Sequence, residues 1–276
     1  MATIKMNFLS KALGRQVSIE AIIPSFSFGD CMNDEHPQDY YQEGMKFQTL
    51  WLLHGFSGDE EDYIKFSNIV RYAEAHKVAV IMPAAYNMGY ADEVEGAKYM
   101  SFVAKELPAV CQAFFPLSTK REDNFIGGLS MGANGAMKIG LAYPEQYSCV
   151  LCMSGATGEI TGSSSSVKWF GNSPEVFGGV VPGRELSRIG TLDDAYFTAK
   201  RNLEEGREVP EFFMSIGDQD FLLEMVRKNK DYLMDLGYKV LYEEVEGYGH
   251  QWEFWDLTLE KALNKWLPLK NSPIYK

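Results

Sequence analysis

Ser130 lies between glycines in the pentapeptide 128–132, where the sequence changes from a strand pattern to a helix pattern. Residues 123–127 have the pattern of a short strand, and residues 131–143 carry apolar side chains at helical spacing. A serine at such a turn is exposed above the N-terminus of the next helix, and the glycines let the backbone bend sharply. Because Gly-rich turns with an ordinary serine also occur, the pattern indicates a nucleophile only if a base and an acid accompany it.

A serine hydroxyl is a poor nucleophile at neutral pH and needs a general base, which an acid in turn orients. In one common arrangement the acid and then the histidine follow the serine along the chain. His250 is the one histidine after Ser130, so this order identifies it as the base by elimination. It lies in a Gly-containing loop after the strand-like residues 240–245, and open α/β sheets bind their ligands at such strand ends. The other histidines are His36, His54 and His76.

Two aspartates compete for the role of the acid. Residues 211–216 have the pattern of a buried strand, and Asp218 and Asp220 lie in the loop directly after it. Asp220 is favoured because the acid usually lies a few residues beyond the strand. Asp218 is expected to form the turn by accepting hydrogen bonds from nearby backbone N–H groups. The sequence therefore predicts that Ser130, His250 and Asp220 act together.

Stabilisation of a tetrahedral intermediate needs an oxyanion hole, built from the N–H after the nucleophile and one N–H from a loop after an earlier strand. The first of these is the N–H of Met131. Residues 49–53 form an apolar run typical of a strand buried on both faces, and the Gly-containing segment 54–58 follows it. Its glycines allow the chain to curl, so that the Phe56 N–H can point at a substrate carbonyl. His54 precedes the nucleophile, and its expected role is to hold this loop by hydrogen bonds.

Four motifs, in the same order along the chain, resemble the signatures of the esterase D family. They are His54–Gly58, Gly127–Gly132, Gly217–Leu222 and Gly249–Trp255, and the likeness extends over nearly the whole chain. Within this family the chain is most similar to the small bacterial tributyrin-type esterases. One departure is Ala133, where the family commonly has a further glycine. Its methyl group is expected to tighten packing in the first helical turn without affecting the chemistry.

The resemblance implies an α/β-hydrolase fold, with a mostly parallel central sheet, helices on both faces and a lid-like insertion. It also implies the roles of five residues: nucleophile Ser130, acid Asp220, base His250, and oxyanion N–H groups from Phe56 and Met131. Relatives in the family include S-formylglutathione hydrolases, acetyl and feruloyl esterases acting on plant polysaccharide, and mycolyl-transferring enzymes. Family membership therefore predicts the reaction better than the substrate.

The composition favours a soluble enzyme. The chain has 276 residues, 46% of them apolar, which agrees with one domain, and the resemblance implies that this is a single α/β-hydrolase domain over residues 1–276. Its net charge of −12 argues against nucleic acid and against anionic membrane surfaces as partners. The sequence has no apolar run long enough to span a membrane. Residues 1–10 lack the long apolar core of a signal peptide, so we expect a first strand there and a cytoplasmic protein.

Cys149 and Cys152 form a C-x-x-C pattern, which also occurs in redox and zinc sites. They lie inside the apolar, strand-like run 147–153, where residues three apart point to opposite faces. Buried thiols in a reducing cytoplasm are the favoured interpretation. No cluster of histidine, cysteine and carboxylate residues has convincing metal-ligand spacing, and neither a metal nor an organic cofactor is expected.

Strand and helix patterns alternate along the chain, as a doubly wound sheet requires. Strands are predicted at residues 2–8, 16–23, 48–53, 78–82, 123–127, 147–154, 211–216 and 240–245. Helices are predicted at residues 62–76, 97–115, 131–143 and 222–236 and from residue 252 onwards, and residues 24–46 are predicted to form a polar loop. Pro108 either kinks the second of these helices or marks its start.

Residues 157–209 are the irregular part of the sequence. An insertion at this point lies over the active-site end of such a sheet, so we interpret it as a lid whose aromatic side chains shape the acyl or alcohol pocket. A surface excursion that packs its own aromatic side chains is the alternative. Trp252 and Trp255 lie close to His250 and are predicted to bind substrate, and residues 87–92 are further candidates to line the pocket.

The sequence thus predicts a cofactor-free serine carboxylesterase that hydrolyses short-chain acyl esters through an acyl-enzyme. Three enzymatic alternatives stay open: a thioesterase of the S-formylglutathione hydrolase type, a carbohydrate acetyl or feruloyl esterase, and acyl transfer to a sugar. A non-catalytic carbohydrate-binding relative is disfavoured by the complete set of reactive groups. The expected partner is a small-molecule or saccharide-linked acyl ester, and a homo-oligomer is compatible with the sequence.

Overall fold

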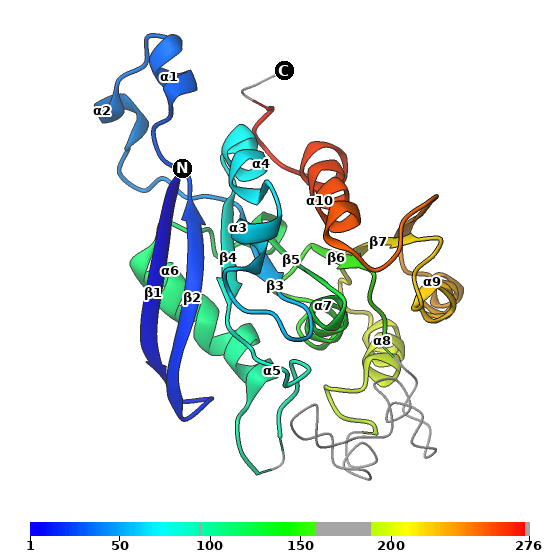
Figure 1. Cartoon of the computed structure of the whole chain (residues 1–276). Helices are drawn as coiled ribbons and strands as arrows, with labels where there is room; N and C mark the ends of the chain where they lie inside the picture. Colours follow the sequence, from blue (N-terminus) through cyan, green and yellow to red (C-terminus); the bar gives the residue numbers. More distant parts are fainter. Residues whose placement is uncertain (94, 158–188, 274–276) are drawn as a thin grey trace.

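The computed structural model describes residues 1–93, 95–157 and 189–273, which are arranged around one eight-stranded sheet (Figure 1). The strands are β1 (Ala2–Ser10), β2 (Arg15–Ile23), β3 (Thr49–Leu53), β4 (Ala79–Pro83), β5 (Asn124–Leu129), β6 (Cys149–Met153), β7 (Glu211–Gly217) and β8 (Val240–Val245). Their order across the sheet is β1-β2-β4-β3-β5-β6-β7-β8. The β1–β2 and β2–β4 pairs are antiparallel, and the strands from β3 to β8 pair in parallel.

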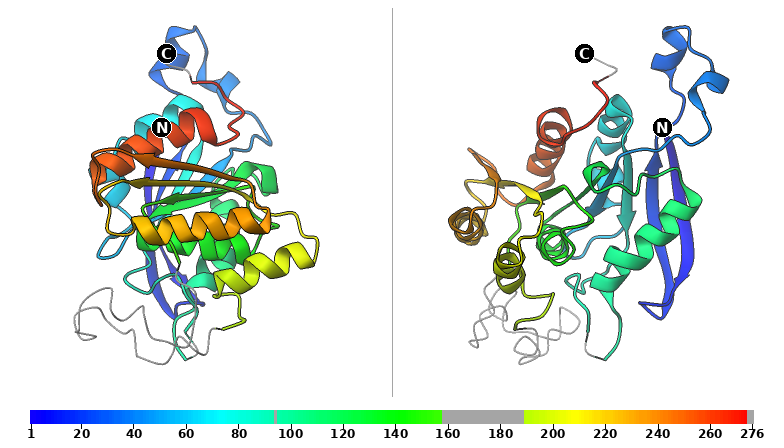
Figure 2. Two further views of the ribbon diagram at one scale, coloured as in Figure 1. Left: turned by 90° about the vertical axis from the view of Figure 1, so that its right-hand side faces the viewer. Right: turned by 180° about the vertical axis from the view of Figure 1, so that it is seen from behind.

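Helices cover both faces of this sheet (Figure 2). The longer ones are α3 (Asp62–Phe66), α4 (Ile69–His76), α6 (Leu107–Phe114), α7 (Met131–Ala142), α8 (Ala195–Glu204), α9 (Leu223–Leu236) and α10 (Trp252–Lys261). Shorter helical segments are α1 (Phe28–Met32), α2 (Pro37–Tyr40), α5 (Tyr99–Ser101), the π-helical η1 (Phe102–Glu106) and η5 (Ala262–Trp266), and the 3₁₀ turn η2 (Arg121–Asp123). One face packs against α3, α4, α10 and η5, and the other against η1 and α6 to α9. The mostly parallel sheet with helices on both faces confirms the predicted architecture.

The central strands are apolar throughout because they are buried on both faces. Every residue of β3, β5 and β6 is buried, and successive side chains enter opposite cores. Cys149 belongs to the core under α4 and α10, whereas Cys152 belongs to the core under α7. Burial raises the pKa of Cys149 to about 11 and also raises that of Cys152 well above its usual range. Both thiols are free and buried, as the sequence predicts.

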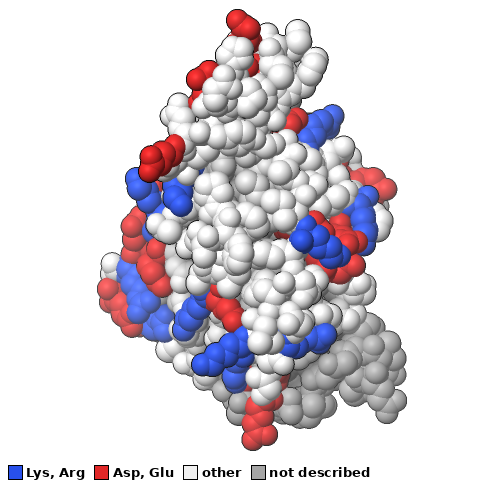
Figure 3. Space-filling model, turned by 90° about the vertical axis from the view of Figure 1, so that its left-hand side faces the viewer, with Lys and Arg blue, Asp and Glu red and all other residues white. Residues whose placement is uncertain are grey.

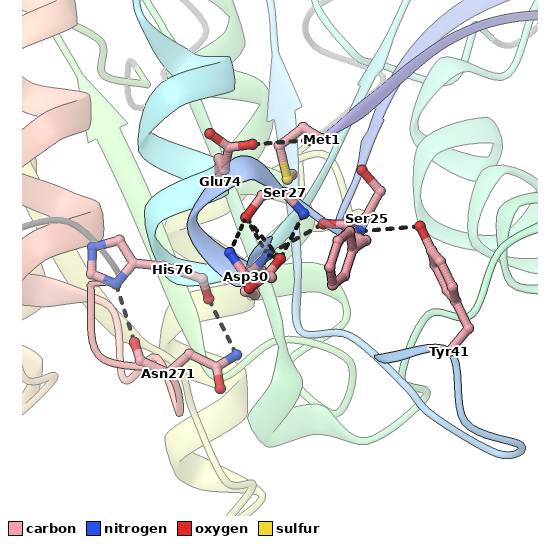
Figure 4. Close-up of polar contacts among 10 residues, drawn as sticks. Met1, Ser25, Ser27, Asp30, Tyr41, Glu74, His76 and Asn271 are labelled. Carbon is pink, nitrogen blue, oxygen red and sulfur yellow. Dashed lines mark hydrogen bonds and ion pairs between the residues drawn. The ribbon is translucent and has the colours of Figure 1, made fainter. Parts of the chain in front are cut away.

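Residues 24–46 were predicted as a polar loop, but they contain α1 and α2 and project beyond the sheet, forming an arm (Figure 1). A capping box starts α1: the Ser27 side chain accepts the Asp30 N–H, and Asp30 Oδ2 accepts the Ser27 N–H at 2.6 Å. Lys77 Nζ donates to Asp30 Oδ2 at 2.6 Å and to the Ser25 carbonyl oxygen at 3.2 Å, which attaches the arm to the end of α4. Figure 4 shows the polar groups of Ser25, Ser27 and Asp30 at this attachment. Burial alone would raise the pKa of Asp30, but the Lys77 ammonium and the Ser27 donors outweigh it and lower that pKa.

Asp30→Asn is therefore expected to loosen the arm, because Lys77 keeps a buried ammonium without its carboxylate. Breaking a buried ion pair in this way costs about 3–5 kcal/mol. We expect faster proteolytic cleavage within residues 24–46, whereas Asp39→Asn on exposed α2 should leave the cleavage rate unchanged. The pKa of Asp30 is lowered in the folded arm, so its contribution is present above about pH 4 and is lost as the pH falls further. Equal cleavage of both variants would contradict the anchoring role.

The helix predicted at 62–76 is instead two helices, with a break at Ser67 and Asn68. Ser67 Oγ donates to the Tyr63 carbonyl oxygen at 2.5 Å, and the Asn68 N–H donates to Asp256 Oδ1 at 2.7 Å. The first contact competes with the helical hydrogen bonds, and the second attaches the break to α10. Because of this break, α3 takes a direction of its own relative to α4.

The described part of 157–209 also differs from the prediction. Residues 195–204 form a regular helix, α8, whose Asp194 N-cap accepts the Phe197 N–H at 3.1 Å. It packs between α7 and α9 on one face of the sheet (Figure 2). The lid proposed for the preceding residues 158–188 lies outside the described residues. The other predicted strands and helices occur within a few residues of their expected bounds, and α6 starts at Leu107 after a π-helical turn.

Charged side chains of both signs alternate over the face formed by β1 and its neighbours (Figure 3). On this face the basic side chains do not join into a continuous patch, and an uncharged area lies between the charged groups. Among the helices that the structure describes, none is long and apolar enough to cross a membrane.

Candidate active site

Ser130 occupies the sharp turn between β5 and α7. It has φ 52° and ψ −117°, a conformation that costs a non-glycine residue about 1–3 kcal/mol. Glycines make the turn feasible, since a Cβ on Gly132 would overlap the Leu53 carbonyl oxygen and a Cβ on Gly155 would overlap that of Ser130. The Ser130 N–H donates to the Met153 carbonyl oxygen at 2.9 Å. The strain is thus held by β3 and β6 on either side of the turn.

His250 joins the serine to the predicted acid. The distance from His250 Nε2 to Ser130 Oγ is 2.9 Å, and that from His250 Nδ1 to Asp220 Oδ2 is 2.8 Å. The three residues are separated by 120 and 30 positions in sequence, and the parallel strands β5, β7 and β8 bring their loops to one edge of the sheet. With Nδ1–H donating to the carboxylate, Nε2 is free to accept the serine proton. The sequence-predicted residues therefore form one continuous chain of hydrogen bonds.

Asp220 is held in the ionised form by its donors. Its side chain is fully buried, and burial alone would raise its pKa. Hydrogen bonds from His250 and from the Leu222 N–H, which lies 2.9 Å from Oδ1, outweigh this effect and lower the pKa of Asp220. A buried, charged acceptor opposite Nδ1 favours the orientation and the tautomer of the imidazole that a base requires.

Asp218 lies outside the hydrogen-bonded chain of Ser130, His250 and Asp220, and its carboxylate bonds to a neighbouring loop rather than to its own turn as predicted. Its carboxylate oxygen Oδ1 accepts the Gly247 N–H at 2.8 Å, while its side chain is exposed. The next residue, Gln219, donates its N–H to the Tyr248 carbonyl oxygen at 2.9 Å. These bonds join the loop of the acid to the loop of the base.

Two aromatic rings flank the imidazole of His250. The ring centroid of Phe221 is 4.7 Å from that of His250, and the ring of Trp255 is 5.0 Å away and nearly perpendicular. Trp255 is buried and also packs perpendicular to Trp252 at 5.2 Å. Phe221 was not singled out by sequence reasoning, although it directly follows the acid.

The loop predicted to form the oxyanion hole lies beside the nucleophile, and His54 holds it as expected. The Ala85 N–H donates to His54 Nε2 at 2.9 Å, so Nδ1 carries the proton and donates to the Gly55 carbonyl oxygen at 2.7 Å. Burial lowers the pKa of His54, which keeps the ring neutral. Phe56 lines the same pocket as Ser130, and Met131 begins α7 directly after it.

A pocket of about 750 Å³ opens in front of Ser130. Residues 55–58 of the oxyanion loop line it together with Phe221, His250, and the predicted Trp252 and Trp255. Besides Phe221, sequence reasoning did not assign to the pocket Asp62 and Phe66, both on α3, or Glu253. Residues 87–92 do not line this pocket, contrary to expectation. Asn87 instead holds a residue that does line the pocket: its Oδ1 accepts the Ser57 N–H at 2.7 Å.

The described residues contain no group of three or more histidine, cysteine and acidic side chains placed to hold a metal ion. A mostly parallel sheet that presents a serine, a histidine and a buried carboxylate in one hydrogen-bonded chain defines the class of α/β-hydrolases. Comparison with known proteins agrees with this class and identifies a family within it.

The chain belongs to the Esterase family (Putative esterase), whose model matches residues 35–266. An acetyl esterase from Caldicellulosiruptor saccharolyticus is 33% identical over 270 residues, covering 97% of this chain and 98% of the relative. Two structures from Staphylococcus aureus are also similar, each covering 96% of this chain and 98% of its own. The fluorophosphonate-binding serine hydrolase FphF has a TM-score of 0.78 at 27% identity, and the S-formylglutathione hydrolase FrmB has 0.79 at 29%. The chain is a carboxylic ester hydrolase with the α/β-hydrolase fold.

Proposed function

We propose that the chain is a serine esterase in which Ser130 is the nucleophile, His250 the base and Asp220 the acid. The observation that carries this proposal is the chain of hydrogen bonds from Asp220 through His250 to Ser130, which ends in the pocket. In this mechanism His250 Nε2 takes the Ser130 proton as Oγ attacks the ester carbonyl, and then gives it to the leaving alcohol. Water hydrolyses the acyl-enzyme by the same route.

The Phe56 and Met131 N–H groups are proposed to bind the oxyanion. Support comes from Phe56, which lines the pocket with Ser130, from Met131, which directly follows Ser130 at the start of α7, and from the hydrogen bonds by which His54 and Asn87 hold the loop. Such donors act without reorganisation at the moment of reaction, and each typically contributes about 2.7–4 kcal/mol to the transition state. Covalent labelling of Ser130 by a fluorophosphonate tests the mechanism directly, and failure of the native enzyme to react would contradict it.

We propose short acyl chains as the natural acyl group. The acetyl esterase from C. saccharolyticus supports this size, and so does the wall of the pocket. Trp255 is buried between His250 and Trp252 and cannot move aside without disturbing the base. Each methylene forced against such a wall costs about 1–3 kcal/mol.

In a panel of p-nitrophenyl esters, we expect the highest kcat/KM for acyl groups of about two to four carbons. All members share one leaving group, so the comparison isolates the acyl chain. Faster hydrolysis of the ten-carbon ester than of the two- and four-carbon esters would contradict the proposal.

A thioesterase of the S-formylglutathione hydrolase type is the second candidate, favoured by the similarity to FrmB. A thioester carbonyl would meet the same serine, histidine and oxyanion donors. Saccharide-linked acetyl or feruloyl esters are compatible with the same machinery. Comparing kcat/KM for S-formylglutathione, acetylated xylan and p-nitrophenyl acetate distinguishes these substrates.

A cytoplasmic location is also part of the proposal. The four cysteines are unpaired in the structure, and the three at positions 111, 149 and 152 are buried. Free thiols are typical of reducing compartments. Fractionation of cells that produce the protein would test this location.

A further inference from the structure

The pocket in front of Ser130 contains acidic side chains but, among the described residues, no permanently cationic one. Asp62 and Glu253 both line it, whereas no lysine or arginine does. The two carboxylates come from elements far apart in sequence: Asp62 begins α3, and Glu253 lies in the first turn of α10. The fold therefore brings two acidic side chains to the pocket from separate helices, and they do not belong to one acidic segment of the sequence.

The carboxylate of Asp62 has no ion-pair partner in the part of the chain that the structure describes. Lys65, on the same helix, instead pairs with Glu61 at 2.7 Å and with Asp59 at 3.5 Å. The Asp62 carboxylate packs against Gly58 of the oxyanion loop, since a Cβ added to that glycine would overlap Oδ2. Its charge thus lies at the wall of the pocket and is not neutralised by an ion pair.

Aromatic rings share the pocket with these carboxylates. Phe66 lies four residues after Asp62, on the same face of α3. Its ring centroid is 5.3 Å from that of Trp252, which in turn is 5.2 Å from that of Trp255. The Phe66 side chain is exposed at the pocket rather than buried in the core. The faces of aromatic rings attract cations, and this attraction adds to that of a carboxylate.

We propose that this pocket selects acyl esters whose leaving alcohol carries a positive charge, as in amino-alcohol and quaternary ammonium esters, and that Asp62 sets this preference. The inference rests on the esterase function proposed above and deepens it. A short acyl group fills a small part of a pocket of about 750 Å³, which leaves Asp62, Phe66 and Trp252 to contact the alcohol. The same carboxylates repel alcohols or thiols that carry negative charge.

Three acetate esters of similar size test the proposal. Acetylcholine is cationic, 3,3-dimethylbutyl acetate is its neutral carbon isostere, and the acetate ester of 2-hydroxyethanesulfonate is anionic. Burial and the Asp59 carboxylate raise the pKa of Asp62, so acetate release is measured at about pH 8, well above the usual range of an aspartate pKa. We expect kcat/KM for acetylcholine to exceed that for the neutral isostere by about tenfold, with the anionic ester slowest.

Asp62→Asn removes the charge and keeps the size of the side chain. We expect the ratio of kcat/KM for acetylcholine to that for the neutral isostere to fall by about three- to tenfold. Asp39→Asn is the matched control, because it makes the same substitution at an exposed position outside the pocket. It should leave the ratio unchanged. Glu253→Gln removes the other carboxylate, which is exposed and lies on α10. The same ratio measured in this variant is a second test that does not depend on the fold of the α3 loop.

The preference should also weaken as salt is raised from about 0.01 M to about 1 M, because salt screens charges at an open pocket. A neutral isostere that equals or exceeds acetylcholine in the native enzyme would overturn the proposal. So would a parallel loss of all three activities in Asp62→Asn, which is the result expected of a purely structural residue. Failure to hydrolyse any ester, p-nitrophenyl acetate included, would instead reject the esterase function itself.

Discussion

Ser130→Ala is expected to abolish ester hydrolysis while leaving the fold intact. Removing the nucleophile of a hydrogen-bonded triad typically lowers kcat by on the order of 10⁶, and a small residual rate arises from the oxyanion hole and substrate binding. The alanine retains the Cβ and therefore the strained backbone at φ 52°, so the turn between β5 and α7 should persist. Steady-state kinetics with p-nitrophenyl acetate and thermal unfolding together measure the two effects.

Ser215→Ala is the matched control for this experiment. Ser215 is also a buried serine at the active-site side of the sheet, on β7, and its hydroxyl has no hydrogen-bond partner among the described residues. It does not line the pocket, so its loss should leave kcat and fluorophosphonate labelling unchanged. Activity within a few fold of the native level in Ser130→Ala would disprove the serine mechanism.

The strands could be predicted because each central strand is buried on both faces. Residues 49–53 and 147–154 are predominantly apolar, and β3 and β6 lie within them. The two thiols of the C-x-x-C pattern could be predicted to be buried for the same reason, since residues three apart on a strand enter opposite cores. In such segments the local sequence pattern and the burial in the folded structure both indicate a strand covered on its two faces.

The residues proposed to be reactive could also be located from the sequence, because chain order and strand ends constrain their positions. His250 followed by elimination from the order of the three groups, and Asp220 followed from its distance beyond the strand 211–216. The parallel sheet then brings both loops to the edge where Ser130 lies. Four short motifs thus located residues that are as much as 120 positions apart.

The missed features depend on contacts between distant segments. The break between α3 and α4 involves Asp256, which is 188 residues from Asn68, and no local pattern shows this bond. Asp62 and Phe66 lie on α3, directly before this break, and line the pocket, which no local pattern predicts either. By contrast, the start of α1 had a local signal, the Ser27 and Asp30 capping box, which was overlooked within an otherwise polar stretch.

Asp220→Asn is expected to lower kcat at neutral pH by on the order of 10⁴, because the amide misorients the histidine. The native carboxylate accepts Nδ1–H of His250 at 2.8 Å. An amide would turn its NH₂ towards Nδ1 and favour the tautomer with the proton on Nε2, which cannot take the proton from Ser130. The amide oxygen can still accept the Leu222 N–H, so thermal unfolding should change little.

Asp218→Asn is the matched control, since it makes the same chemical change two residues earlier in the same loop. Asp218 is exposed and accepts the Gly247 N–H, and weakening this bond should cost at most about 1 kcal/mol of stability. We therefore expect a large loss of kcat with near-native melting for Asp220→Asn, and nearly native kcat with slightly lower melting for Asp218→Asn. The opposite pattern would assign the acid to Asp218. It would also mean that the hydrogen bond from His250 to Asp220 does not orient the base during the reaction.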